Sequence, residues 1–211
     1  MNKRTNSEDL DFMLPTEQLA YTCSEVVSTK YEFHLDQDIL EPSYYRNLIE
    51  VLNNATEQDL VVLNINCDGG MLDSAISIID ALRNTQANTL AWISGSCYSA
   101  ASLLALSCQN IEVGDFATLM AHNSQYGLGG YTTDIKDRAV FEHKMTSKIL
   151  HSVYDGFLTK EEIDTVLANK TIWMDADEIS ERVAVMQEKR MKQFEDENNE
   201  AEKPIKKILV S

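Results

Sequence analysis

The run Leu60-Val61-Val62-Leu63-Asn64-Ile65 is the stretch of sequence that decides the fold. Its side chains are almost all apolar instead of alternating with polar ones, as expected of a parallel strand that is covered on both faces of a sheet. Asp68-Gly69-Gly70 ends the run, after which apolar residues return at helix intervals at Leu72, Ala75, Ile76, Ile79 and Leu82. The order of buried strand, glycine turn and helix predicts a β-α unit.

Strands and helices alternate on both sides of this unit. Apolar periodicity and the turn residues between the runs mark the further elements. The sequence predicts strands over 31–35, 90–93, 111–113 and 118–121, and helices over 43–53 and 99–107. This alternation predicts an α/β domain in which right-handed crossovers join the strands.

The character of the sequence changes at Gly127. Gly127, Gly129 and Gly130 form a flexible link before a long amphipathic helix over Thr132–Phe157. Thr159 with Glu162 forms a capping box for the next helix, and Asp175 begins a third. We expect a mobile N-terminal arm over 1–20, one domain over 21–185 with its long-helix region at about 127–158, and a charged C-terminal tail over 186–211.

Composition excludes several classes of protein. The 34 acidic residues outnumber the 18 basic ones and give a net charge of −16, which does not suit a nucleic-acid partner. No run approaches the roughly 20 apolar residues of a membrane span, and the N-terminus lacks the order of a secretion signal. The cysteines, without metal-ligand spacing, are interpreted as buried thiols: Cys23, Cys67, Cys97 and Cys108. We therefore expect a cytoplasmic protein without metal or other cofactor.

Ser99 and His122 are the candidate catalytic pair. Ser99 lies where a predicted strand gives way to a helix, whose N-terminal N–H groups favour negative charge; the alternative role is a helix cap or a packing residue. A serine hydroxyl needs a base to become a nucleophile. His122 follows the predicted strand 118–121, at the edge where open α/β sheets place their sites. The other histidines lie in less suitable positions: His34, His143 and His151.

Gly69-Gly70 is a candidate source of oxyanion stabilisation. The pair lies between a buried strand and a helix, and glycine lets a backbone N–H approach a substrate closely. The alternative is a tight strand-to-helix turn with no other role.

Four segments together resemble those of Clp proteolytic subunits, a family of serine peptidases with a ClpP/crotonase-like α/β fold and a protruding long handle helix. Ile65–Gly70 is similar to the family's INSPGG segment, and Gly95–Ala101 to its GQAASMG nucleophile segment. Met120–Asn123 is similar to its MIHQ segment, and Leu128–Tyr131 to its LGGY stretch. The four occur in the family's order within about residues 30–185.

The resemblance implies a role for each matched residue. Ser99 is the nucleophile, His122 is the general base, and the backbone N–H groups of Gly70 and Ala100 form the oxyanion hole. The residues implied to bind an extended peptide by strand addition are Leu128, Gly129 and Gly130.

The resemblance also implies a function and partners. We expect a serine endopeptidase of unfolded proteins or peptides that forms heptameric rings stacked to a tetradecamer. The long helix would join the two rings, and an AAA+ unfoldase would consume the ATP.

The sequence departs from the family at the third catalytic position. The family has an aspartate two residues before an aromatic residue, here Trp173, and Thr171 occupies that place. We expect the Thr171 hydroxyl or a backbone carbonyl to orient His122 and activity to be reduced. The alternative is that a nearby acid takes this role: Asp164, Asp175 or Asp177. The family's Gly-Gln pair, its arginine (here Ile172) and its axial loop are also missing, which weakens the expectation of rings and an unfoldase.

Two other functions stay open. The missing aspartate also suits a non-catalytic ring subunit. Separately, the divergence from the family would suit a plastid-type, phage-encoded or paralogous subunit. A crotonase-type enzyme acting on acyl-CoA shares the fold, but it would use acids in the site and a basic surface, and the sequence indicates neither.

Overall fold

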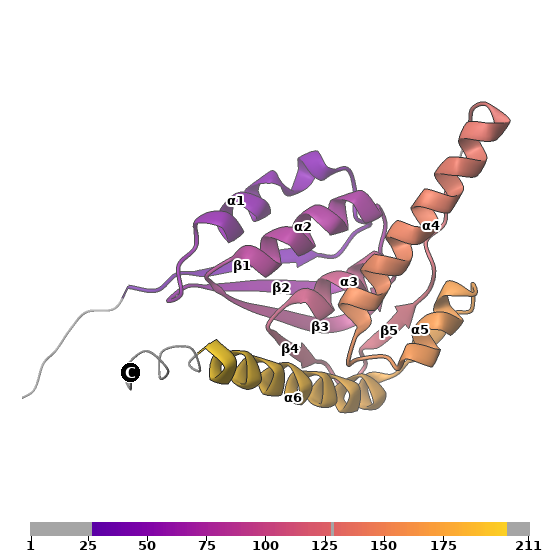
Figure 1. Cartoon of the computed structure of the whole chain (residues 1–211). Coiled ribbons are helices and arrows are strands. Elements are labelled where there is room, and N and C mark those ends of the chain that lie inside the picture. Colours follow the sequence, from indigo (N-terminus) through magenta and orange to yellow (C-terminus); the bar gives the residue numbers. More distant parts are fainter. Residues whose placement is uncertain (1–26, 128, 202–211) are drawn as a thin grey trace, which may run out of the picture.

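The computed structural model describes residues 27–127 and 129–201 (Figure 1). The predicted N-terminal arm, Cys23, Leu128 and the end of the predicted tail lie outside these residues. In chain order the elements are β1 (Lys30–Leu35), η1 (Pro42–Tyr45), α1 (Arg46–Asn54), β2 (Leu60–Cys67), α2 (Leu72–Asn84), β3 (Asn88–Tyr98), α3 (Ala100–Ser107), β4 (Asn110–Val113), β5 (Thr118–Ala121), α4 (Thr132–Tyr154), α5 (Lys160–Leu167), β6 (Ile172–Met174) and α6 (Ala176–Ala201).

The strands form one sheet in the order β1-β2-β3-β5-β6, with β4 paired to β3 beside β5. All pairs are parallel except β5 with β6. The sheet depends on the length of β3. Its first part pairs with β4 through Leu90–Ile93, and its last part pairs with β5 through Ser96–Tyr98. The end of β3 therefore lies next to the end of β5, and the predicted α/β class is confirmed.

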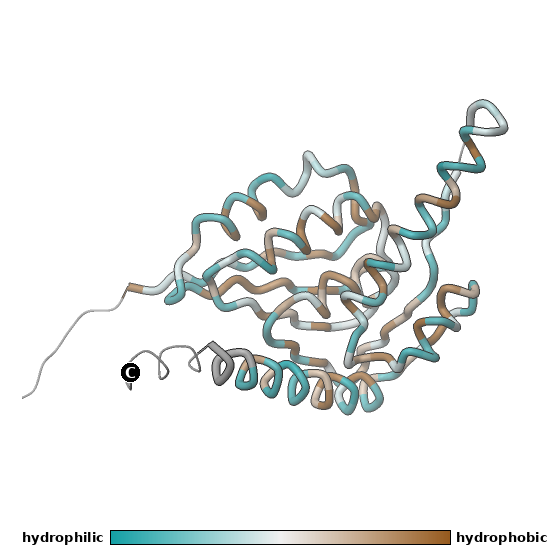
Figure 2. Tube along the Cα trace, in the orientation of Figure 1, coloured by the Kyte–Doolittle hydropathy of each residue, from teal (hydrophilic) through white to brown (hydrophobic). Residues whose placement is uncertain are grey.

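Helices cover both faces of the sheet. Figure 1 shows α1 and α2 on one face and α6 on the other, where α6 contacts β4 and β5. Helix α3 packs between α2 and β3, and all its residues up to Leu106 are buried. Strand β2 is buried at most positions, as its apolar run predicts, and Figure 2 shows hydrophobic residues concentrated along the central strands.

Helix α4 is the long helix that the sequence predicts, and much of it projects from the domain (Figure 1). Its buried residues all lie in its C-terminal part: Thr146, Leu150, Val153 and Tyr154. That part packs against α3, so α4 is seated at one end only.

Local signals at the helix ends are confirmed. The Thr159 hydroxyl accepts from Glu162 N, and the Glu162 carboxylate accepts from Thr159 N, which completes the predicted capping box of α5. The Asp175 carboxylate accepts from Glu178 N at 3.0 Å and caps α6.

The first part of the predicted charged tail is helical. Helix α6 continues through residue 186, where composition predicts the start of the tail, and it reaches Ala201. Met186 is buried, and the Arg190 guanidinium donates to the carbonyl oxygens of Leu106 and Cys108. These contacts join the charged segment to the end of α3, where the last carbonyls of a helix lack partners within it.

Candidate active site

Ser99 stands between β3 and α3 with a strained backbone. Its φ of 56° and ψ of −123° lie where non-glycine residues rarely occur, a conformation that costs about 1–3 kcal/mol and persists only when neighbouring contacts fix it. Its N–H donates to the carbonyl oxygen of Met120 on β5 at 2.8 Å. Its side chain makes no capping hydrogen bond to α3, so the interpretation of Ser99 as a helix cap is wrong.

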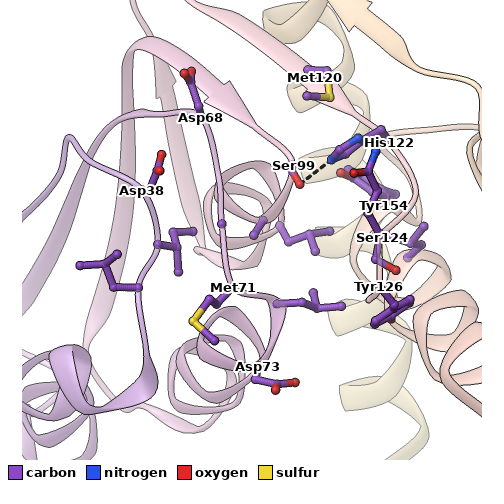
Figure 3. A pocket seen from close by; sticks show the side chains of 18 residues that line it. Asp38, Asp68, Met71, Asp73, Ser99, Met120, His122, Ser124, Tyr126 and Tyr154 are labelled. Carbon is purple, nitrogen blue, oxygen red and sulfur yellow. Dashed lines mark hydrogen bonds between the residues drawn. The ribbon is translucent and has the colours of Figure 1, made fainter. Parts of the chain in front are cut away.

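The Ser99 hydroxyl instead meets His122. Figure 3 shows the two side chains directed at each other across the ends of β3 and β5, and Ser99 Oγ lies 2.7 Å from His122 Nε2. The pairing of Cys97 with Leu119 and of Tyr98 with Met120 brings both residues to the same edge. When Nε2 accepts the hydroxyl proton, Nδ1 carries the ring proton of the neutral tautomer.

Burial lowers the pKa of His122. An adjacent carboxylate would raise this pKa. The lowered pKa therefore agrees with the hydrogen bonds of the described residues, none of which joins His122 to a carboxylate. Within residues 27–127 and 129–201, His122 makes no side-chain hydrogen bond except that with Ser99. Thr171 is exposed and makes no hydrogen bond with the imidazole, so the structure adds no contact in favour of its expected role.

Asn169 contacts the residue that follows His122. Asn123, the residue after His122, donates through its side-chain amide to Asn169 Oδ1 at 2.8 Å and to the Leu167 carbonyl at 3.2 Å. Asn169 has a φ of 64°, which asparagine tolerates better than most residues. Asn169 was not predicted from the sequence: an asparagine just past the C-cap of a helix indicates its backbone conformation, but not its contact with Asn123.

Gly69 and Gly70 lie against the nucleophile segment. A Cβ built on Gly69 would lie 2.8 Å from Ser99 Cβ and 3.2 Å from Ala100 N, so the two backbones are in contact. A Cβ on Gly70 would clash with the Ile39 carbonyl oxygen, and both glycines have positive φ. Gly70 and Ala100 line the same cavity as Ser99. This arrangement suits two backbone donors directed at one oxyanion.

A cavity of about 640 Å³ opens beside Ser99 and His122. Its walls come from the β1–η1 segment, the β2–α2 turn, the chain after His122 and the base of α4, through Ile39, Met71, Tyr126 and Leu150 among others. The acids on its wall are Asp38, Asp68 and Asp73, and no lysine or arginine of the described residues lines it (Figure 3). None of these three acids was predicted to lie in the site.

Gly129 and Gly130 are exposed, and a Cβ on either would contact nothing within 4 Å. Leu128, the third residue of the expected peptide-binding edge, lies outside the described residues. Over the described parts of the chain, no group of three or more His, Cys, Asp or Glu side chains is arranged to hold a metal ion. Cys67, Cys97 and Cys108 are buried free thiols, as predicted.

The comparisons with known proteins agree with this geometry. A family model described as Clp protease matches residues 21–182. The chain belongs to the Clp protease family. No curated protein matched the sequence. Membership of the Clp protease family, with the mostly parallel sheet and the projecting α4, confirms the expected ClpP/crotonase-like fold.

Within residues 27–127 and 129–201 of this Clp protease family member, no helix has the length and apolar character needed to span a bilayer.

Proposed function

We propose that this chain is a serine endopeptidase that cleaves peptide bonds of unfolded proteins or peptides through an acyl-enzyme at Ser99. The 2.7 Å contact between His122 Nε2 and Ser99 Oγ carries the proposal. A neutral imidazole within hydrogen-bond reach is what turns a serine hydroxyl into a nucleophile. The lowered pKa of His122 supports the same role, because it keeps the ring unprotonated at neutral pH.

The reaction follows from the positions of these groups. His122 Nε2 takes the hydroxyl proton while Ser99 Oγ attacks the carbonyl carbon, and the N–H groups of Gly70 and Ala100 stabilise the resulting oxyanion. The C–N bond then breaks, and His122 gives the proton to the leaving amine. In the second half, water attacks the acyl-enzyme with His122 again as base, which releases the product acid and restores Ser99.

The expected substrate is an extended peptide. Leu128, Gly129 and Gly130 would pair with its backbone by strand addition, since glycines leave the edge open to a second chain. The acyl-CoA alternative is disfavoured, because the phosphates of CoA are anionic, whereas the described residues line the cavity with three aspartates and with no lysine or arginine.

The proposal includes a ring-shaped assembly. Family membership supports heptameric rings stacked to a tetradecamer, with α4 joining the rings and an AAA+ unfoldase feeding the chamber. The end-seated α4 suits this role, because most of its length is available to a second copy of the chain.

One observation favours a second candidate, a catalytically weak or inactive ring subunit. Within the described residues, His122 has no hydrogen bond to steady the imidazole besides that with Ser99. In the serine-protease triad, replacing the aspartate by asparagine lowers turnover by about 10⁴.

A fluorophosphonate probe distinguishes the two candidates. Labelling of the wild-type protein, with no labelling of Ser99→Ala and little of His122→Ala, supports the peptidase. Degradation of an unfolded protein such as reduced casein would then be measured with the same variants. Absence of labelling in a protein that still forms rings, as measured by light scattering, would support the inactive subunit.

A further inference from the structure

Two buried hydroxyl groups form a chain that ends on the nucleophile's own carbonyl. Ser102 Oγ donates to Ser99 O at 2.7 Å, and Ser102 Oγ lies 2.7 Å from the Tyr154 hydroxyl. Ser102 is fully buried and Tyr154 is 1% exposed. A serine hydroxyl carries one proton, which Ser102 gives to Ser99 O, so Tyr154 must be the donor in its bond with Ser102.

The carbonyl at the end of this chain belongs to the peptide unit that supplies an oxyanion donor. The C=O of Ser99 and the N–H of Ala100 lie in one planar peptide unit and point in opposite directions when it is trans. A bond that fixes the direction of the Ser99 oxygen therefore fixes the direction of the Ala100 N–H. Donation to the oxygen also polarises the peptide unit, and linked hydrogen bonds strengthen one another.

The Ser102 hydroxyl makes the shortest of the contacts that hold this peptide. The other donors to Ser99 O are the backbone N–H groups of Ser102 and Leu103, at 3.1 and 3.4 Å. Ser99 is strained, so its conformation depends on such contacts. Tyr154 is the last residue of α4 and lies at its buried C-terminal end. The two hydrogen bonds therefore join this end of α4 to Ser99.

We propose that Ser102 and Tyr154 are positioning residues, which orient and polarise the Ser99–Ala100 peptide so that the Ala100 N–H stabilises the oxyanion. This inference rests on the proposed function. Neither residue touches the substrate in this mechanism, and Tyr154 acts only through Ser102.

The experiment measures the rate of fluorophosphonate labelling and the kcat and KM for a fluorogenic peptide. The variants are Tyr154→Phe, Ser102→Ala and the double variant. Removing a whole oxyanion-hole donor costs about 10²–10³ in rate, so we expect weakening one to cost roughly tenfold. KM and the pH midpoint set by His122 should stay unchanged. The double variant should match Ser102→Ala alone, because residues acting in series are not additive.

Tyr98→Phe is the matched control. It removes another tyrosine hydroxyl from the residue next to Ser99, one that bonds Thr118 Oγ1 at 2.8 Å and not Ser102. We expect this variant to label at the wild-type rate.

The outcomes distinguish failure of the proposed peptidase function from failure of the positioning role of Ser102 and Tyr154. If the wild-type protein is not labelled, the proposed function fails and this inference fails with it. Wild-type labelling overturns the inference alone if Tyr154→Phe and Ser102→Ala keep the wild-type rate, if Tyr98→Phe loses as much as they do, or if the two losses add in the double variant. If circular dichroism shows that Tyr154→Phe does not fold, Ser102→Ala, which removes one atom, decides the question.

Discussion

At the scale of the residue, burial of the imidazole sets the pH range in which His122 would work as the proposed base. The neutral ring is the active form, and its pKa is lowered below the ordinary value of about 6.5. We expect the acid limb of the labelling rate to have its midpoint below pH 6.5. A pH series with the fluorophosphonate probe measures it, and a midpoint above 6.5 would contradict the site as described.

The same shift has a consequence for stability. A histidine whose folded-state pKa is lowered stabilises the fold above its unfolded pKa, near 6.5, and loses this contribution as the pH falls through the folded value. His122→Gln removes the titration. The melting temperature of the wild type minus that of this variant should therefore decrease as the pH falls below about 6.5.

Asn169 allows a direct test of the missing charge. Asn169 and Thr171 are both exposed, but only Asn169 is hydrogen-bonded to Asn123, the residue after His122. We expect Asn169→Asp to raise the pKa of His122 and to increase kcat, because a nearby carboxylate stabilises the imidazolium. Thr171→Asp is the matched control with the same added charge. A larger gain from Thr171→Asp would favour the position that the sequence predicts.

Only those residues of the candidate site whose positions follow from their neighbours in the sequence could be predicted. Ser99 follows a strand and His122 follows another, so their roles could be inferred from chain order and family resemblance. Tyr154 and Asn169 come from distant segments that the fold brings to these strand ends. Nothing in the residues beside them indicates those contacts, so neither was predicted.

At the scale of the element, one arginine joins α5 to α6. Arg182 donates to both carboxylate oxygens of Glu162, at 2.7 and 2.9 Å, and also to Glu178 on its own helix. This contact lowers the pKa of Glu162 from 4.5 to about 2. The pair therefore stabilises the fold above about pH 4.5, and this stabilisation is lost as the pH falls towards 2.

We expect Arg182→Met to lower the free energy of unfolding by about 1 kcal/mol at pH 7, as for a partly exposed pair. The loss should shrink between pH 4.5 and 2. Urea unfolding at several pH values measures it. Arg138→Met, which removes a longer and more exposed pair with Glu142 on α4, is the control and should change stability less. A pH-independent loss in Arg182→Met would mean that packing, not charge, is responsible.

Most helices and strands could be predicted, because the spacing of apolar residues along the chain indicates which side of each element is buried. The boundaries that differ depend on tertiary partners. Strand β3 extends from the predicted Leu90–Ile93 to Tyr98, because its second half has β5 as a neighbour. Helix α6 continues beyond residue 186 because Arg190 binds the end of α3. In both cases the deciding partner is remote in sequence.

At the scale of the whole molecule, the exposed part of α4 is the surface most suited to join two rings. Val140 and Phe141 are 65% and 59% exposed on the part of α4 that projects from the domain. We expect Val140→Asp with Phe141→Asp to prevent ring stacking, since each chain already carries a net charge of −16 and added acids increase repulsion. Sedimentation or light scattering would measure a change from double to single rings.

Met191→Asp with Phe194→Asp is the matched control for this prediction. These residues are 66% and 68% exposed on α6, so the control adds the same two acids at similarly exposed apolar positions without touching α4. Equal loss of assembly in both variants would argue against a specific role for α4.

The antiparallel pair of β5 and β6 has a consequence for how the protein matures during synthesis. Strand β5 carries His122 at its end, and its outer neighbour β6 is made only after α4 and α5. Because chains fold from the N-terminus as the ribosome releases them, the serine segment can pack before the histidine strand has both neighbours. A nascent chain that stops before Ile172 should thus carry Ser99 without a fixed base, and we expect it to stay inert until β6 has been made.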